Sequence, residues 1–322
     1  AVPDVVAPPT SLVQVERPIR SVLFGLVRKS KADPDTLTFG EAVEVWRKLG
    51  ARRLKATTVV GYTKNLSTYL LPWFRDMRML DLDRATLAPF EMELVEAGLS
   101  DRSRNNILIT RRSIVRFVCD LTDWKVPRWP KLLPIKIKHY DPPTREEVQK
   151  LLDAAPAPDT KLAIALASYA GLRAGEVRGL RPIDVDLGRG TLTVRQTLYQ
   201  GKADTPKSGH ERQIPLAPVL HRLLEEASHT WTGSTERVTA AREKPRWSTQ
   251  ALRHAFLTTF RRAGLPPHRF HGLRHFFISF CFEGGADAPT VQKLAGHCHL
   301  SVTQRYAHTQ DHRLRQAVQV FG

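Results

Sequence analysis

A proline-rich segment near the middle of the chain limits what this sequence can fold into. The stretch VPRWPKLLPIKIKHYDPP, residues 126–143, contains five prolines. Proline lacks a backbone N–H and its ring clashes with the preceding helical turn, so this stretch forms no regular helix. At 322 residues the chain is also longer than most single domains. We therefore expect two domains, joined by a linker at residues 126–141.

The sequence before this linker has the hydrophobic period of helices. Thr38 and Glu41 have the spacing of a capping box, and apolar residues from Phe39 to Trp46 recur on one helical face. Further helices are predicted over residues 57–74, 85–98 and 102–121. The apolar side of the last one carries Ile107, Ile114, Val118 and Leu121. We expect a small all-α domain at residues 36–125, preceded by a flexible tail at residues 1–35.

The sequence after the linker predicts a larger domain, residues 142–322. Thr144 and Glu147 repeat the capping-box spacing at the start of a helix. Residues 190–216 alternate apolar and polar side chains between glycine-rich turns, which indicates two or three short antiparallel strands. The predicted fold class is therefore mainly α, with a small antiparallel β-sheet in the larger domain.

The charge of the chain indicates its partner. Lys and Arg number 49 against 32 acidic residues, a formal charge of +17, which favours a polyanion. The longest apolar run, LAIALASYAGL at residues 162–172, is too short to cross a bilayer, so we expect nucleic acid and no membrane. The N-terminus lacks the pattern of a signal peptide. The three cysteines form no CxxC pair, so we expect a reducing, cytoplasmic location.

Several cations gather in the predicted α-helical domain. Three precede its second helix, and Arg104 and Arg111 share one face of the helix over residues 102–121, with Arg112 and Arg116 beside it. Such clusters are common on solvated helices, but the overall positive charge favours contact with phosphate. The predicted DNA-binding residues are Arg52, Arg53, Lys55, Arg104, Arg111, Arg112 and Arg116.

The stretch LAGHCHLSVTQRYAH, residues 294–308, suggests a metal site or a reactive tyrosine. His297, Cys298 and His299 are consecutive, so their side chains diverge and do not form a zinc cage. No HExxH motif is present either, and we expect no metal and no cofactor. Ser301 and Gln304 have capping-box spacing and predict a short helix carrying Tyr306. A tyrosine in such a helix is usually a packed side chain, so its role depends on other residues.

Four motifs occur in one order: YAGLRAGEVRGL (169–180), TPKSGHERQIPL (205–216), FHGLRHFF (270–277) and the stretch at 294–308. Together they resemble the tyrosine recombinases, the family of phage integrases. The resemblance implies the catalytic residues Arg173, Lys207, His271, Arg274, His297 and Tyr306, with Glu176 in support. The sequence departs from the family pattern at two places. Gly272 stands where Asp is common, and GHCH, residues 296–299, stands where GHSS is common. Lys202 is a second candidate for the hairpin lysine.

The resemblance also implies a fold and an activity. The fold is a two-domain tyrosine recombinase, with an α-helical core-binding domain and a mixed α/β catalytic domain. The activity is site-specific recombination, in which duplex DNA is cleaved and rejoined through a covalent 3′-phosphotyrosine. Arg173 and Arg274 would bind the nonbridging oxygens, and Lys207 would protonate the leaving oxygen. His271 would assist proton transfer, and His297 would donate to the phosphate. The reaction serves integration, excision or resolution.

The partners implied are double-stranded DNA and three further copies of the chain, as a homo-tetramer on two DNA sites. The family also allows an accessory DNA-bending protein. The terminal segment DHRLRQAVQVFG predicts an apolar helix face, which docks either on a neighbouring subunit or within its own chain. Alternatives are a type IB topoisomerase-like strand transferase, a catalytically silent DNA-binding protein and a metal-dependent nuclease.

Overall fold

The structure is a computed structural model, and it describes residues 37–122, 124–127, 129–135, 141–199, 201–206, 209–231, 237–239, 247–300 and 303. The chain divides into two compact units, Ala1–Lys138 and His139–Gly322. The division falls within the proline-rich stretch 126–143. The predicted tail at residues 1–35 lies outside the described residues. Each unit has a hydrophobic core of its own.

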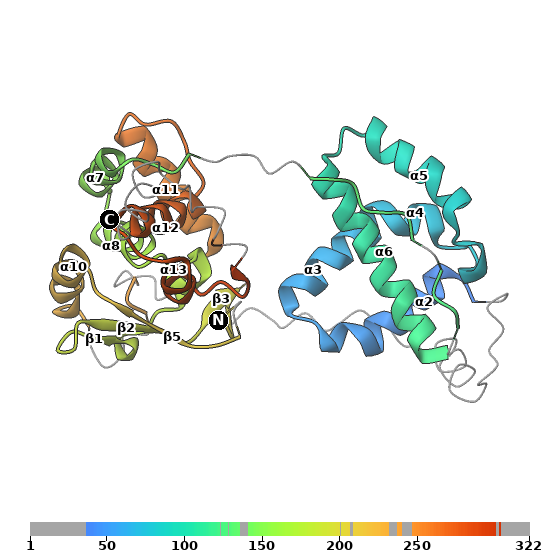
Figure 1. Cartoon of the computed structure of the whole chain (residues 1–322), viewed down its shortest axis with the longest axis horizontal. Helices are drawn as coiled ribbons and strands as arrows, with labels where there is room; N and C mark the ends of the chain where they lie inside the picture. Colours follow the sequence, from blue (N-terminus) through green and yellow to red (C-terminus); the bar gives the residue numbers. More distant parts are fainter. Residues whose placement is uncertain are drawn as a thin grey trace, which may run out of the picture. The chain divides into compact units, whose positions relative to one another are not determined.

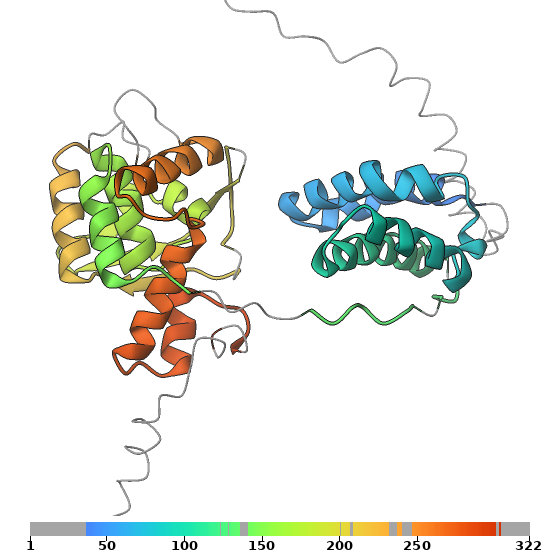
Figure 2. The ribbon, with the colours of Figure 1, turned by 90° about the horizontal axis from the view of Figure 1, so that it is seen from above.

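The described part of the first unit contains helices and no strand, apart from an isolated β-bridge between Thr38 and Arg78. α2 (Phe39–Val45) continues through a π-helical turn, η2 (Trp46–Gly50), into a 3-10 turn, η3 (Ala51–Arg53). α3 (Ala56–Asn65), the π-helical η4 (Leu66–Leu70) and α4 (Leu71–Phe74) follow, and then the 3-10 turn η5 (Met79–Asp81), α5 (Arg84–Glu96) and α6 (Asp101–Thr122). The helices predicted over residues 57–74, 85–98 and 102–121 are confirmed. Figure 2 shows α2 and α3 on one side of the unit and α5 and α6 on the other.

The first helix begins where the sequence predicts. The Thr38 amide donates to Glu41 Oε2 at 2.9 Å, and the Glu41 amide donates to Thr38 Oγ1 at 3.2 Å. This capping box satisfies two amides that have no partner within the helix. The core beneath it contains Phe74, whose ring packs edge-on against Phe39 at 6.1 Å and Phe90 at 4.9 Å between ring centroids.

One predicted core residue of α6 is exposed. Ile107, Ile114 and Val118 are buried as expected, but Leu121 keeps 43% of its surface exposed. The buried stripe steps by four residues from Val118 to Thr122, and this step leaves Leu121 at the edge of the stripe. Its prediction as a core residue was therefore wrong.

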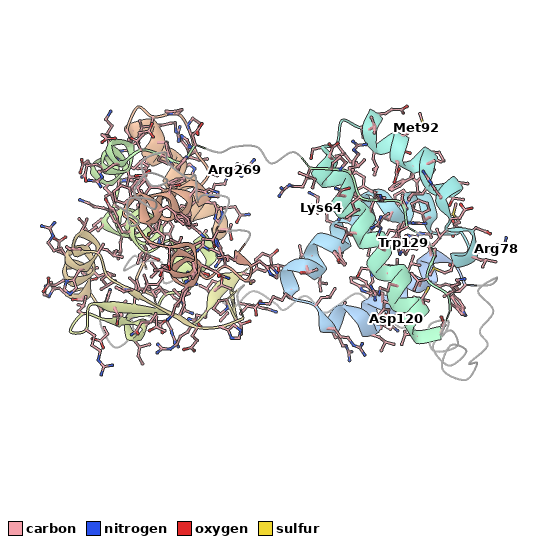
Figure 3. All side chains as sticks on the ribbon, viewed as in Figure 1. Lys64, Arg78, Met92, Asp120, Trp129 and Arg269 are labelled. Carbon is pink, nitrogen blue, oxygen red and sulfur yellow. The ribbon has the colours of Figure 1, made fainter. Side chains whose placement is uncertain are left out.

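The start of the linker packs on α6. The Asn105 side chain donates from Nδ2 to the Leu133 carbonyl at 2.9 Å and accepts from the Leu133 amide at 2.9 Å. Trp129 lies against the same helix (Figure 3), with the Arg111 and Arg112 guanidinium carbons 5.4 and 5.7 Å from its ring centroid. Residues 129–135 therefore belong structurally to the first unit.

The second unit is mainly helical and has a small sheet. Its helices are α7 (Arg145–Ala154), α8 (Pro158–Tyr169), α9 (Ala174–Gly179), the 3-10 turn η6 (Pro182–Asp184), α10 (Pro218–Ser228), α11 (Thr249–Arg262), α12 (His271–Glu283) and α13 (Ala288–Ala295). Its strands are β1 (Val185–Asp186), β2 (Thr191–Val194), β3 (Thr197–Tyr199), β4 (Lys202–Asp204) and β5 (Arg212–Pro215). The predicted fold class, mainly α with a small antiparallel sheet, is confirmed.

The strands form two antiparallel groups. β2 lies between β1 and β5, with Val194 opposite Arg212, and β3 pairs with β4 in a separate hairpin. In Figure 1 the three-stranded sheet lies at the opposite side of the unit from α7. Arg178 of α9 holds the hairpin, because its Nη2 donates to the Leu198 carbonyl at 2.6 Å. This contact holds the hairpin beside α9.

The start of the second unit and its last described helices complete the scaffold. Thr144 and Glu147 form the predicted capping box at the start of α7. α12 and α13 run side by side at one end of the unit (Figure 2) and share a small cluster of buried residues that includes Phe277 and Val291. This cluster fixes the end of α13, where the functional residues meet.

Candidate active site

The C-terminal end of α13 lies at the centre of the site. The final carbonyl groups of a helix have no partner within it and carry partial negative charge. Three consecutive carbonyls here each accept a hydrogen bond from a different arginine. Arg212 Nε donates to Leu294 at 3.0 Å, Arg274 Nη2 to Ala295 at 2.5 Å, and Arg173 Nη2 to Gly296 at 2.9 Å.

These three arginines come from different parts of the sequence. Arg212 begins β5, Arg274 lies in α12, and Arg173 is the residue that precedes α9. Arg274 is 1% exposed, and its Nη1 also donates to the Gly171 carbonyl at 2.6 Å. The Arg173 side chain is 21% exposed. The helix end therefore gathers three cations, of which Arg173 is the one with substantial exposed surface.

Glu176 is the counter-ion of this cluster. Its carboxylate is 1% exposed and accepts from Arg173 Nη1 at 2.8 Å and from Arg212 Nη2 at 2.7 Å. The Arg173 amide donates to the same carboxylate at 2.9 Å. Burial alone would raise the pKa of Glu176, but hydrogen bonds and charge from Arg212 and Arg173 hold the pKa at about 2. Glu176 is therefore ionised at neutral pH and fixes the direction of both guanidinium groups.

His297 follows directly after this helix end. Its amide donates to the Gln292 carbonyl at 3.1 Å, and its ring Nδ1 lies 2.8 Å from Thr303 Oγ1. Burial, together with the charges of Arg274 and Arg173, lowers the pKa of His297 to about 3. The ring of His297 is therefore neutral at neutral pH. Gln292 holds the His297 backbone, and Thr303 holds its ring.

His271 lies at the start of α12, one turn before His275. The two rings meet edge to face, with their centroids 4.7 Å apart. His271 is exposed, whereas His275 is partly buried, and burial with the charge of Arg274 lowers the pKa of His275. The charge of His271 also lowers the pKa of His297, so His271 and His297 share one electrostatic environment.

The structure therefore brings together Arg173, Glu176, His271, Arg274 and His297. Lys207 and Tyr306 lie outside the described residues, as do the capping box at Ser301 and Gln304 and the terminal segment 311–322. The alternative hairpin lysine, Lys202, is exposed on β4.

Sequence reasoning missed Arg212. The residue stands in the quoted motif TPKSGHERQIPL, five residues after Lys207, but its partners are 36 and 82 residues away in the sequence. One signal was available, because an arginine at an inward-facing strand position is buried only when it is paired. The neighbouring Ile214 is buried on the same face of β5.

The predicted DNA-binding cations differ in exposure. Arg52, Arg53, Lys55 and Arg116 are exposed. Arg104 pairs with Asp101, and Arg112 donates to the Pro130 carbonyl, so both are partly engaged within the protein.

Arg111 requires a correction. It is 1% exposed, donates to the Leu82 carbonyl at 2.8 Å, and lies 5.3 Å from the Phe74 ring centroid. Burial lowers the pKa of Arg111 to about 10, so it keeps its charge at neutral pH. Because its guanidinium lies beside the Phe74 and Trp129 rings and donates to the Leu82 carbonyl, Arg111 is a structural residue of α6 and not a phosphate contact.

Two further features of the described residues concern metal binding and membrane insertion. No group of three or more His, Cys, Asp or Glu side chains in this part of the chain could hold a metal ion. Within the same residues, no helix is long and apolar enough to cross a membrane.

The chain is similar to known tyrosine recombinases and integrases. The model of the phage integrase family matches residues 144–313. Tyrosine recombinase XerA of Thermococcus kodakarensis is 30% identical over 248 residues, covering 74% of this chain and 81% of the relative. Tyrosine recombinase XerD of Bifidobacterium longum is 27% identical over 288 residues, covering 80% of this chain and 88% of the relative.

Solved structures show the same fold. The Tn1549 transposon integrase in complex with a circular intermediate DNA has a TM-score of 0.73 at 16% identity, covering 89% of this chain and all of that one. A lambda integrase dimer bound to a COC′ core site has a TM-score of 0.68 at 18% identity, covering 85% and 97%.

Fold and relatives together define a site-specific DNA recombinase of the tyrosine type. The chain belongs to the phage integrase family. The topoisomerase-like and catalytically silent alternatives are not favoured, because the named relatives are recombinases and integrases.

Proposed function

We propose that Tyr306 attacks a DNA phosphate held at the end of α13 by Arg173 and Arg274, with His271, His297 and Lys207 moving protons. The observation that carries this proposal is the convergence of three arginines on three consecutive carbonyls directly before His297. The carbonyls fix each guanidinium before DNA arrives. Preorganised donors stabilise developing charge without reorganising during the reaction.

The charge of the cluster suits a phosphoryl transition state. Three arginines and one buried carboxylate, Glu176, leave an excess of two positive charges around the site. The pentacoordinate phosphorane gathers negative charge on its equatorial oxygens, and arginine presents planar donors that match them. The guanidinium groups thus supply the charge stabilisation that a metal ion supplies in other phosphoryl transferases.

The chemical step forms one bond and breaks one. The Tyr306 oxygen attacks phosphorus, a P–O bond to tyrosine forms, and the bond to the 5′ oxygen breaks. Lys207 donates a proton to the leaving 5′ oxygen, and His271 takes part in removing the phenol proton. His297, neutral in the DNA-free protein, donates a hydrogen bond to the phosphate. The phosphotyrosine keeps the energy of the broken bond, so a 5′ hydroxyl can rejoin the strand without ATP.

The two units have different roles, one in DNA binding and the other in catalysis. We assign residues 36–125 to a core-binding domain, residues 126–141 to a linker whose residues 129–135 pack on that domain, and residues 142–322 to catalysis. The exposed and partly exposed cations of the first unit contact the phosphate backbone. These contacts contribute affinity that does not depend on the DNA sequence. The proposed phosphate contacts are Arg52, Arg53, Lys55, Arg104, Arg112 and Arg116.

The assembly is a homo-tetramer on two DNA sites. A lambda integrase tetramer bound to a Holliday junction has the same fold, with a TM-score of 0.66 at 16% identity. The apolar terminal segment 311–322 is the candidate contact between neighbouring subunits. An accessory DNA-bending protein and a cytoplasmic location complete the proposal, and the cysteines Cys119, Cys281 and Cys298 suit a reducing compartment.

The test separates binding from cleavage. DNA carrying the protein's own site is selected from a random duplex library and bound by wild type, Arg173→Ala and Arg274→Ala. We expect both variants to retain most of their DNA affinity, which also shows that they fold. Single-turnover cleavage should fall by about 10²- to 10³-fold, as when a transition-state donor is lost. Wild-type rates in both variants would exclude the arginines from the reaction.

A further inference from the structure

Arg212 is a buried arginine that links three elements at the site. It stands opposite Val194 in the β2–β5 pair, and its side chain is 5% exposed. Its guanidinium donates to Glu176 Oε1 at 3.2 Å and to Oε2 at 2.7 Å, and its Nε donates to the Leu294 carbonyl at 3.0 Å. One side chain therefore ties β5 to α9 and to the end of α13.

We propose that Arg212 is a positioning residue for DNA cleavage, which sets the placement of Arg173 through Glu176 and of His297 through the end of α13. This inference rests on the proposed function of the site. All three nitrogens of the Arg212 guanidinium donate within the protein, to Leu294 and Glu176, so Arg212 acts through these two contacts and is not itself a catalytic residue.

The first contact controls the charge that Arg173 offers to a phosphate. Glu176 shares its carboxylate between Arg212 and Arg173, at 2.7 and 2.8 Å. A buried carboxylate requires full compensation by a partner. Without Arg212, Glu176 would depend on Arg173 alone, and it would draw that guanidinium away from the exposed side of the site. Arg212 therefore leaves Arg173 available to DNA.

The second contact fixes the backbone that precedes His297. The Leu294 carbonyl is the first of three consecutive carbonyls that accept hydrogen bonds from arginines. The carbonyls of Ala295 and Gly296 follow it. The side chain of Arg212 also fills the space beside Gly296, where an added Cβ would lie 2.9 Å from Arg212 Cδ. Removing Arg212 would leave the Leu294 carbonyl without this donor and would open the space beside Gly296.

The experiment uses the full chain and nicked DNA that carries its selected site. The variants are Arg212→Gln, Glu176→Gln and the double variant, with Leu224→Ala of α10 as a control that destabilises the same unit by removing a buried side chain. DNA affinity, thermal stability and the rate of adduct formation at saturating protein are measured for each. Wild type and Tyr306→Phe report on the proposed function itself.

We expect Arg212→Gln to slow cleavage by roughly 10- to 100-fold, the effect of a misplacement of about 1 Å, while DNA affinity changes far less. The double variant should be no slower than the slower single variant, because both changes act through one contact. Leu224→Ala should lose stability and cleave at the wild-type rate below its melting temperature.

Three results would overturn the proposal: wild-type cleavage by Arg212→Gln, a loss no greater than that of a Leu224→Ala control of equal stability, or independent effects that multiply in the double variant. If Arg212→Gln does not fold, Arg212→Lys replaces it. An ammonium can reach Glu176 but cannot hold the Leu294 carbonyl in the same geometry, so slower cleavage supports the proposal and an unchanged rate overturns it. An adduct from wild type but not from Tyr306→Phe keeps the proposed function intact whatever Arg212 does.

Discussion

At the residue scale, Gly296 meets two requirements that no other residue type meets. Its backbone is left-handed, with φ of +64°, and it lies directly between the last residue of α13 and His297. A Cβ added there would lie 2.9 Å from Arg212 Cδ and 3.1 Å from Arg212 Nη1. Because Glu176 and Leu294 hold that guanidinium, it cannot move aside without losing hydrogen bonds.

We predict that Gly296→Ala destabilises the protein and slows cleavage. The matched control is Gly264→Ala, because Gly264 has φ of +67° but nothing within 4 Å of its added Cβ. The control should lose about 1–2 kcal/mol in urea unfolding, the cost of a left-handed alanine. Gly296→Ala should lose more, and it alone should cleave more slowly. Equal losses and equal rates would show that the contact with Arg212 is unimportant.

The pKa of Glu176 predicts how acid affects stability. Its folded pKa is about 2 against an ordinary value of 4.5. A lowered carboxylate pKa stabilises the fold above pH 4.5, and this contribution is lost as pH falls toward 2. Its size is on the order of 3 kcal/mol.

Urea unfolding of wild type and Glu176→Gln between pH 7 and pH 2 measures this contribution. The first unit is the same in both proteins, so their difference reports on the second unit. We expect wild type to be the more stable at pH 7 and the difference to shrink between about pH 5 and pH 2. His297 also titrates, but it is present in both proteins. A difference independent of pH would contradict the assignment of the low pKa to Glu176.

At the element scale, local signals predicted where helices begin, and long-range contacts decided which side chains are buried. The capping boxes at Thr38 and Thr144 were predicted because each is complete within four residues of sequence. Arg111 was misassigned because its partner is the Leu82 carbonyl, 29 residues away. A charge pattern on one helix cannot show which carbonyl another element brings to it.

For the site as well, the sequence predicted the residues that short motifs contain and missed those that only long-range contacts bring together. Arg173, Glu176, Arg274 and His297 were identified from motifs by resemblance, and the structure brings them together. Arg212 and the role of the α13 carbonyls were missed, because the sequence carries no local pattern for a contact that joins residues 212 and 294. Tertiary contacts of this kind follow from the packing of whole elements.

Arg111 and Arg116, both in α6, allow a direct test of the structural role now assigned to Arg111. Arg111→Met should cost about 1–3 kcal/mol of stability, because the buried Leu82 carbonyl loses its donor. Arg116 is exposed, so Arg116→Met should change stability by less than about 0.5 kcal/mol and should weaken DNA binding. Urea unfolding and DNA titrations at several salt concentrations measure both effects. A reduced salt dependence in Arg111→Met would return that residue to the list of phosphate contacts.

At the scale of the whole molecule, the formal charge of +17 indicates binding dominated by phosphate contacts. Each phosphate contact contributes a slope of about −0.9 to the dependence of log affinity on log salt. We therefore expect the affinity of the full chain for duplex DNA to fall by about 10³- to 10⁵-fold between 50 and 200 mM salt, if about six to ten phosphates are contacted. A nearly flat dependence would contradict DNA binding by both units.

The measurement that tests the central claim most directly is the trapping of the covalent intermediate. Nicked DNA carrying the selected site is incubated with wild type or Tyr306→Phe in EDTA, and the products are separated on a denaturing gel. We predict an adduct with wild type alone, attached at a 3′ phosphate and mapped by mass spectrometry to Tyr306. An adduct with Tyr306→Phe, or tight binding by wild type without any adduct, would contradict a tyrosine nucleophile at this site.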